Sequence, residues 1–182
     1  MVDMARHLVK HYQTFLYLTC IYIITKQFFM SFFEKLLTTD GARSTIVIRV
    51  LVGVVFLSEG IQKFLYPEQR GAGRFKDIGL PEPELLGYMI GGFEVICGIL
   101  VLIGLFTRFA SFILICIMLV AIASTKIPIL MDEGFWQMMH DIRNDWSMLL
   151  GSIFLLIKGG GKYSLDHQLF KRKNYYKRSK RL

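Results

Sequence analysis

Two stretches decide the fold: LLGYMIGGFEVICGILVLIGLF, residues Leu85–Phe106, and FASFILICIMLVAIASTKIPILM, residues Phe109–Met131. Each is about as long as the ~20 apolar residues that an α-helix needs to cross the ~30 Å hydrocarbon core of a bilayer. The first stretch carries one charged residue, Glu94, and the second carries one, Lys126. Charged side chains inside such helices are costly and usually functional. The sequence therefore predicts an integral membrane protein whose buried charges are the first candidates for a site.

The composition agrees with this class, because 53% of the 182 residues are hydrophobic and fifteen are Phe. A preceding span is predicted over Thr45–Leu65. A fourth helix is expected to begin within residues 135–145 and to run to Ile157, before three consecutive glycines (159–161) that do not continue a helix easily. The predicted fold is an all-α, four-helix membrane bundle covering residues 46–166.

The two ends of the chain differ from this core. Residues 1–45 contain an apolar, Phe-rich segment, 11–37, that favours an amphipathic helix lying in the membrane interface, and a fifth spanning helix is the alternative. From Lys158 onward there are nine Lys or Arg and one acid, whereas the preceding residues carry 13 of each sign. We therefore expect residues 167–182 to form a basic cytoplasmic tail that is attracted to anionic lipid. Nothing else in the chain favours a nucleic-acid partner.

This topology gathers the charges in one half of the bundle. Four spans with a cytoplasmic tail place the connections 68–83 and 132–141 on the outward side. Most ionisable residues of the predicted spans then fall in the outward half, and these residues are Glu59, Lys63, Glu94, Lys126, His140, Asp141 and Asp145. The convergence of acids and bases predicts a shared site beneath the outward surface.

Residue spacing refines this prediction. Glu59 and Lys63 are four residues apart and share a helix face. Gly87, Gly91, Glu94 and Gly98 recur at steps of four, three and four, which is typical of a small-residue face that packs against another helix. The carboxylate of Glu94 is therefore expected to point into the bundle, where it must be paired, hydrogen-bonded or protonated.

A purely structural interpretation stays open. The pairs Glu59–Lys63 and Glu94–Lys126 would then be ion pairs that fix helix register, with no ligand. His140 is one histidine without a partner at helical spacing, so a haem or metal site is not favoured.

Three motifs, in order along the chain, resemble the DoxX/DoxD-like family of small membrane proteins. They are RVLVGVVFLSEGIQKFLYP at residues 49–67, GGFEVICGILVLIGLFTR at residues 91–108, and GGGKYSLD at residues 159–166. The resemblance implies a four-helix membrane bundle and a multi-pass protein of the bacterial inner membrane. The family takes its name from subunits linked to quinone-dependent oxidation, including thiosulfate:quinone oxidoreductases. An acidic residue often opens the last helix of the family, and Asp141 and Asp145 are the candidates here.

The function expected from residues and resemblance together is a subunit of a quinone-linked oxidoreductase complex. A quinol site needs a proton acceptor, for which Glu94 or Glu59 is suited, and a nearby cation, Lys63 or Lys126, to tune it. The further candidates for binding residues are His140, Asp145, Phe56, Phe93 and Trp146, the three aromatic residues as a lining for the quinone ring. The sequence supports no haem, flavin or metal site, so electrons are expected to pass to partner subunits. The chain alone is not expected to be an enzyme.

Two other functions compete with this one. The first is a non-catalytic assembly factor or scaffold whose buried charges are structural. The second is a small-molecule or proton carrier, which is disfavoured because matched Gly/Pro breaks in the spans are lacking. Self-association into a homo-oligomer is compatible with each of them.

Overall fold

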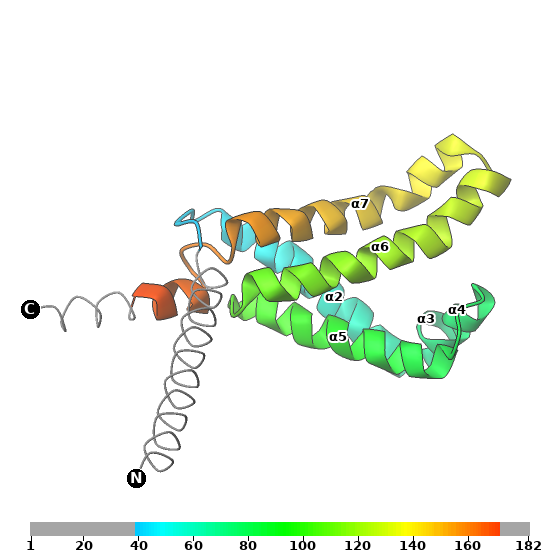
Figure 1. Ribbon diagram of the computed structural model, residues 1–182, viewed down its shortest axis with the longest axis horizontal. Helices are drawn as coiled ribbons and strands as arrows, with labels where there is room; N and C mark the ends of the chain where they lie inside the picture. Colours follow the sequence, from blue (N-terminus) through cyan, green and yellow to red (C-terminus); the bar gives the residue numbers. More distant parts are fainter. Residues whose placement is uncertain (1–38, 172–182) are drawn as a thin grey trace, which may run out of the picture. The chain divides into compact units, whose positions relative to one another are not determined.

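The computed structural model describes residues 39–171, and the regular structure of this part of the chain is entirely α-helical. Four long helices run alongside one another (Figure 1): α2 (Thr45–Leu65), α5 (Pro83–Ile103), α6 (Thr107–Asp132) and α7 (Phe135–Lys158). Two short helices, α3 (Pro67–Arg70) and α4 (Ala72–Asp77), lie in the connection between α2 and α5. The predicted all-α fold class is confirmed.

Three of the long helices, α2, α5 and α6, are long and apolar enough to cross a membrane. Helix α7 is different, because its first half carries His140, Asp141, Arg143 and Asp145 before the apolar second half begins. It has 24 residues, which is enough length for a span, but its composition is mixed. The membrane-protein class is therefore supported by three helices, and the crossing of α7 stays a prediction.

The helix boundaries follow local signals. Helix α2 covers the predicted Thr45–Leu65. Helix α5 begins at Pro83, two residues before the predicted start, because proline is well suited to the first turn of a helix. It ends at Ile103 because Gly104 adopts a left-handed conformation with φ 70°, which is the usual way to end a helix. Helix α6 continues through Pro128 to Asp132.

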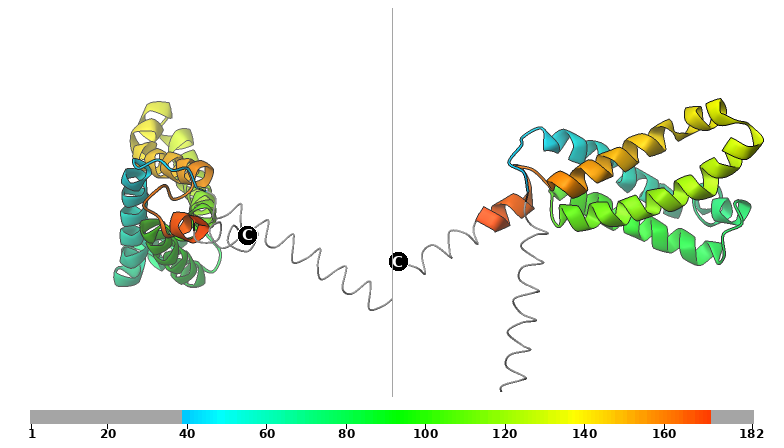
Figure 2. Two further views of the ribbon diagram at one scale, coloured as in Figure 1. Left: turned by 90° about the vertical axis from the view of Figure 1, so that its left-hand side faces the viewer. Right: turned by 45° about the horizontal axis from the view of Figure 1, so that its top comes forward.

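The long helices form two pairs. Helix α2 packs against α5 and α6 packs against α7, while contacts of α5 with α6 and of α2 with α7 join the pairs. The start of α2, the α5–α6 turn and the end of α7 lie at one end of the bundle, and α3, α4 and the α6–α7 turn lie at the other (Figures 1 and 2). We call the first the basic end, after Arg43, Arg108, Lys158 and Lys162.

The α2–α5 interface depends on glycine. A Cβ atom on Gly98 would lie 2.9 Å from the backbone nitrogen of Leu57, and one on Gly60 would lie 2.8 Å from the carbonyl oxygen of Gly91. Such distances are shorter than real contacts, so the two backbones approach closely only because side chains are lacking there. Gly91 and Gly98 of the glycine face predicted on α5 therefore pack against another helix, as expected, and that helix is α2.

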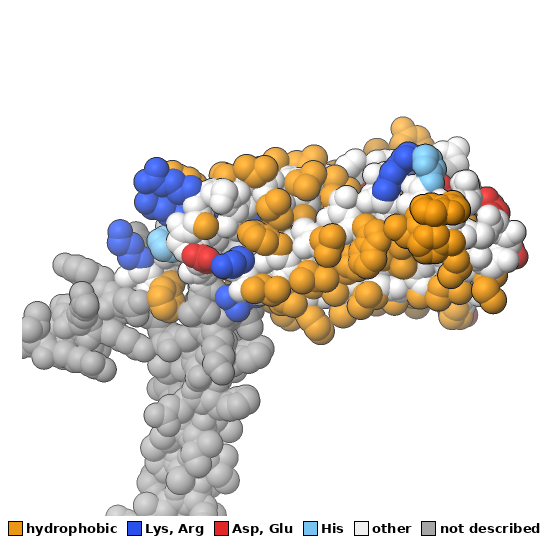
Figure 3. Space-filling view, turned by 90° about the horizontal axis from the view of Figure 1, so that it is seen from above, with side chains coloured by type: hydrophobic (Ala, Val, Ile, Leu, Met, Phe, Trp, Pro, Cys, Tyr) orange, Lys and Arg blue, Asp and Glu red, His pale blue; other side chains and the backbone are white. Residues whose placement is uncertain are grey.

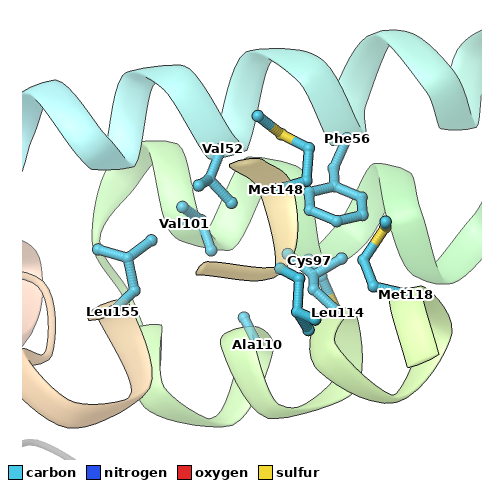
Figure 4. Packing of buried hydrophobic residues seen from close by; sticks show 10 residues of the cluster. Val52, Phe56, Cys97, Val101, Ala110, Leu114, Met118, Met148 and Leu155 are labelled. Atoms are coloured by element: carbon cyan, nitrogen blue, oxygen red, sulfur yellow. The ribbon is translucent and has the colours of Figure 1, made fainter. Parts of the chain in front are cut away.

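Apolar side chains from all four long helices fill the space between them (Figure 4). Outside this core, apolar side chains remain exposed over much of the surface seen in Figure 3, as suits a lipid-facing protein. The buried hydrophobic cluster consists of Val52, Phe56, Cys97, Val101, Ala110, Leu114, Met118, Met148, Leu149 and Leu155.

Residues 1–38 and 172–182 lie outside the described residues. The predicted N-terminal helix within residues 11–37 and most of the predicted tail, 167–182, fall there and stay predictions.

Candidate functional site

A buried ion pair joins the middle of α5 to the last turn of α2. Lys63 Nζ lies 2.5 Å from Glu94 Oε2, and the two side chains are 10% and 6% exposed. The approach depends on Gly91, since a Cβ atom there would lie 3.2 Å from Lys63 Cβ. The carboxylate thus points into the bundle, as its place in the glycine face indicated.

Two further charges surround this pair. Glu59, one helical turn before Lys63, and Arg74 of α4 both interact electrostatically with Glu94. The charges of Glu59, Lys63 and Arg74, from α2 and α4, therefore all act on Glu94 of α5. We call Glu59, Lys63, Arg74 and Glu94 the Glu94 cluster.

Helix α4 is held next to the cluster by close backbone packing. A Cβ atom on Gly87 would lie 2.9 Å from the backbone nitrogen of Ala72, and one on Gly71 would lie 2.8 Å from the carbonyl oxygen of Lys63. Phe75 of α4 is buried, 8% exposed. The sequence did not point to Arg74, because the loop around it lacks helical periodicity, although Gly71 and Gly87 are signs of close packing.

An aromatic pair lies beside the cluster on the same two helices. The ring centroids of Phe64 and Tyr88 are 6.0 Å apart, and the rings are tilted by 34°. Phe64 packs close to Gly91, and both aromatic side chains are about half exposed on the outer, apolar surface. The sequence did not predict this pair, because the two rings come together only when α2 and α5 pack in the observed register.

A second ion pair joins α6 to α7. Lys126 Nζ lies 3.2 Å from Asp145 Oδ2, with the side chains 14% and 28% exposed. The structure thus pairs Lys63 with Glu94 and Lys126 with Asp145, rather than Glu59 with Lys63 and Glu94 with Lys126. The reason is the packing of α6 on α7, which brings Lys126 to a residue of its own helix pair. Between residues 39 and 171, no further ion pair or hydrogen bond links the Lys63–Glu94 pair to the Lys126–Asp145 pair.

Among residues 39–171, the remaining predicted site residues form no ion pair or hydrogen bond with Glu94. Phe56 belongs to the buried core, whereas Phe93 and Trp146 are 44% and 43% exposed. His140 is exposed, and its Nδ1 lies 3.3 Å from Arg143 Nη1. Within residues 39–171, no three His, Cys, Asp or Glu side chains gather as metal ligands would.

A different charged centre lies at the basic end. Arg49 of α2 is 2% exposed and donates hydrogen bonds to four backbone carbonyl oxygens. Its Nε bonds to Val101 (2.9 Å), its Nη1 to Gly160 (3.1 Å) and Tyr163 (2.8 Å), and its Nη2 to Leu102 (2.5 Å). One side chain thus ties α2 to the end of α5 and to the segment after α7.

Asp166 completes this centre. It is 1% exposed, and its carboxylate accepts hydrogen bonds from the backbone nitrogens of Phe106 (2.8 Å) and Thr107 (2.9 Å) and from Thr107 Oγ1 (2.9 Å). Burial raises the pKa of Asp166, while the hydrogen bonds from Thr107 and Phe106 and the charge of Arg49 oppose the rise. The GGGKYSLD motif therefore holds the start of α6 in place, and its role is structural.

Three apolar helices of membrane-spanning length, with a buried ion pair between two of them, define a small helical membrane protein. The chain belongs to the DoxX family, whose family model matches residues 44–127. This segment contains both members of the Lys63–Glu94 pair.

Two relatives support this assignment. "Uncharacterized membrane protein Rv3486" of Mycobacterium tuberculosis (strain ATCC 25618 / H37Rv) is 51% identical over 144 residues, which cover 76% of this chain and 88% of the relative. "Putative oxidoreductase CatD" of Bacillus subtilis (strain 168) is 32% identical over 131 residues, which cover 71% of this chain and 89% of the relative. No solved structure matches the chain.

Proposed function

We propose that this protein is a membrane subunit of a quinone-linked oxidoreductase complex and that Glu94 is its proton acceptor. The observation that carries the proposal is the Lys63–Glu94 pair, which is buried between two apolar helices. Ionisable groups at such places are by default functional. The name of the Bacillus subtilis relative supports an oxidoreductase role.

The cluster has the chemistry that quinol oxidation requires. A quinol that is oxidised gives up two electrons and two protons. The two electrons pass to a redox-active partner subunit, and a carboxylate within reach of the quinol hydroxyls accepts the two protons one after the other and releases each toward the outward side. Glu94 is that carboxylate, and Lys63 is the cation that pairs with it. Glu59, which interacts electrostatically with Glu94, is the next carboxylate on the proposed path of the proton toward the outward side.

The aromatic pair gives the quinone a place to bind. Phe64 and Tyr88 are exposed on the apolar surface next to Lys63, so a quinone dissolved in the bilayer reaches them without entering water. Aromatic side chains stack well on a flat ring. In this arrangement the basic end faces the cytoplasm, and the Glu94 cluster lies in the opposite half of the membrane.

Exchange of Glu94 tests the proposal. Glu94→Gln keeps the shape of the side chain and an oxygen that accepts a hydrogen bond from Lys63, but it cannot take up a proton. We expect quinone-dependent turnover of the native complex to fall by at least about a hundredfold, the usual contribution of a general base. Asp145→Asn in the Lys126–Asp145 pair is the matched control and should leave turnover unchanged. Wild-type turnover in the Glu94 variant would refute the proposal.

The second candidate function is a non-catalytic scaffold or assembly factor. It is favoured by one observation, which is that Lys63, Glu94, Lys126 and Asp145 all have partners within the chain. A scaffold predicts that Glu94→Gln lowers the amount of protein in the membrane and leaves the turnover of each remaining complex as it was. Turnover must therefore be normalised to the amount of folded protein.

A further inference from the structure

We propose that the basic end carries a binding surface for the phosphate groups of anionic phospholipids. The surface is formed by Arg43, Arg108, Lys158 and Lys162, which we call the basic collar. This inference does not depend on the proposed quinone chemistry, because the collar lies at the basic end, whereas the Lys63–Glu94 pair joins the last turn of α2 to the middle of α5.

One backbone and one side-chain hydrogen bond bring together three segments of the collar that are distant in sequence. Lys162 N donates to Ala42 O at 3.2 Å, which brings Lys162 to the residue next to Arg43. Arg108 Nη2 donates to Ile157 O at 2.8 Å, which brings Arg108 next to Lys158. The four bases therefore lie on segments that hydrogen bonds hold together in pairs.

The same segments are fixed by a second set of contacts. Asp40 N donates to Lys158 O at 2.8 Å, and Lys158 Nζ lies 2.9 Å from Asp40 Oδ2. Thr39 Oγ1 accepts a hydrogen bond from Gly161 N. Because like charges repel one another, the positions of the collar residues are set by these contacts of the fold.

The charges of the described residues are distributed unevenly between the two ends. The opposite end, from Glu59 through Asp145 without Arg108, holds ten acids and six bases. At the basic end, Arg49 and Asp166 are buried. The exposed part therefore has one acid, Asp40, against five bases, and Figure 3 shows Lys and Arg side chains gathered there. These five bases are Arg43, Arg108, Lys158, Lys162 and Lys171.

The collar lies where phospholipid phosphates lie. The apolar helices α2 and α6 begin at this end and α5 ends there, so the collar marks the boundary of the hydrocarbon layer. Tyr163 and Leu165 beside it are 55% and 39% exposed, as is usual for side chains at the membrane interface. An apolar rim favours a lipid over free phosphate or nucleic acid. Arg108 Nε is buried and has no hydrogen-bond partner among residues 39–171, so the protein leaves one donor of this guanidinium unused.

Native mass spectrometry of the full chain in detergent micelles, titrated with phosphatidylglycerol or phosphatidylcholine, tests this proposal. We expect phosphatidylglycerol to bind more tightly than phosphatidylcholine. The double variant Arg43→Gln/Lys162→Gln should weaken phosphatidylglycerol binding about tenfold, since each base near an anionic lipid surface contributes several-fold. The matched control Arg70→Gln/Lys76→Gln removes two exposed bases at the opposite end and should have no effect.

Three results would overturn the proposal. The first is equal affinity for the two lipids. The second concerns the affinity for phosphatidylglycerol in the collar and control variants. An equal loss of affinity in both would assign binding to net charge, and no loss in either would assign it to the tail. The third is displacement of phosphatidylglycerol by inorganic phosphate at a similar concentration, which would identify free phosphate as the ligand. Melting temperatures of both variants within a few degrees of the wild type exclude unfolding as the cause.

Discussion

Lys63 Nζ and Glu94 Oε2 lie 2.5 Å apart, and this pair joins the last turn of α2 to the middle of α5. The contact exists because glycines at positions 60, 91 and 98 let the two helices approach to near backbone contact. Charge pairing and close packing thus depend on each other, because the pair is shielded only while the glycine face is closed. This coupling gives the first prediction.

Removal of one charge of the Lys63–Glu94 pair should destabilise the protein more than removal of both. Lys63→Met or Glu94→Leu leaves one buried charge without its partner, and each should lower the free energy of unfolding in detergent by about 3–5 kcal/mol. The double variant should be more stable than either single variant, because no buried charge remains. A double-mutant cycle measured by denaturant titration gives the coupling energy. Additive losses would mean that the two side chains do not interact.

The Phe64–Tyr88 pair should contribute to quinol binding rather than to proton transfer. Tyr88→Leu removes a ring beside the Glu94 cluster and keeps an apolar side chain of similar reach. We expect the KM for quinol in the native complex to rise about fivefold with little change in kcat, since a stacking contact contributes about 1 kcal/mol. The matched control is Phe112→Leu, an exposed aromatic residue of α6. A rise of KM in the control as well would assign the effect to lipid contacts.

Close packing of α2 on α5 has its own test. Gly98→Ala adds a Cβ atom 2.9 Å from the backbone nitrogen of Leu57, and backbone cannot move aside as a side chain can. We expect a loss of about 1–3 kcal/mol of stability, as overpacking costs. Gly92→Ala is the control on the same helix, because no atom lies within 4 Å of the added Cβ. This variant should be as stable as the wild type or slightly more, since alanine favours the helix.

Asp166 should make the stability of the basic end dependent on pH. In Asp166→Asn, an NH2 group replaces one of the carboxylate oxygens that accept hydrogen bonds from the backbone nitrogens of Phe106 and Thr107. At neutral pH this change should lower the free energy of unfolding by about 2–3 kcal/mol. Because burial raises the pKa of Asp166 above the ordinary value of 3.8 for an Asp side chain, this carboxylate binds a proton more tightly in the folded protein than in the unfolded chain. The stability of the wild type relative to the variant should therefore rise as pH falls from the raised pKa toward 3.8.

Thermal unfolding of both proteins across this pH range measures the difference. A wild-type stability that falls relative to Asp166→Asn on acidification would mean that the hydrogen bonds from Phe106 and Thr107 outweigh burial.

The long helices could be predicted because their signals are local. Continuous apolar residues define α2, α5 and α6, and the steps between Gly87, Gly91, Glu94 and Gly98 identify the face of α5 that packs against α2 and α4. The boundaries shifted by two or three residues where proline and a left-handed glycine decide them.

The pairing of charges could not be predicted in the same way. Which cation meets Glu94 depends on which helices are neighbours and on their register, and one sequence does not determine either. Lys126 was a reasonable partner by depth, but the packing of α6 on α7 gives it Asp145. Arg74 was missed because it lies in a connection without periodicity. Arg49 was identified as a motif residue, but its four carbonyl partners come from segments 52 to 114 residues away.

Redox-induced infrared difference spectroscopy of the native complex tests most directly whether Glu94 takes up a proton during quinol oxidation. We predict a protonated carboxyl band that appears on turnover in the wild type, disappears in Glu94→Gln and persists in the control Asp145→Asn. A spectrum of Glu94→Gln that retains the band, or a wild-type spectrum without one, would contradict the proton-acceptor role.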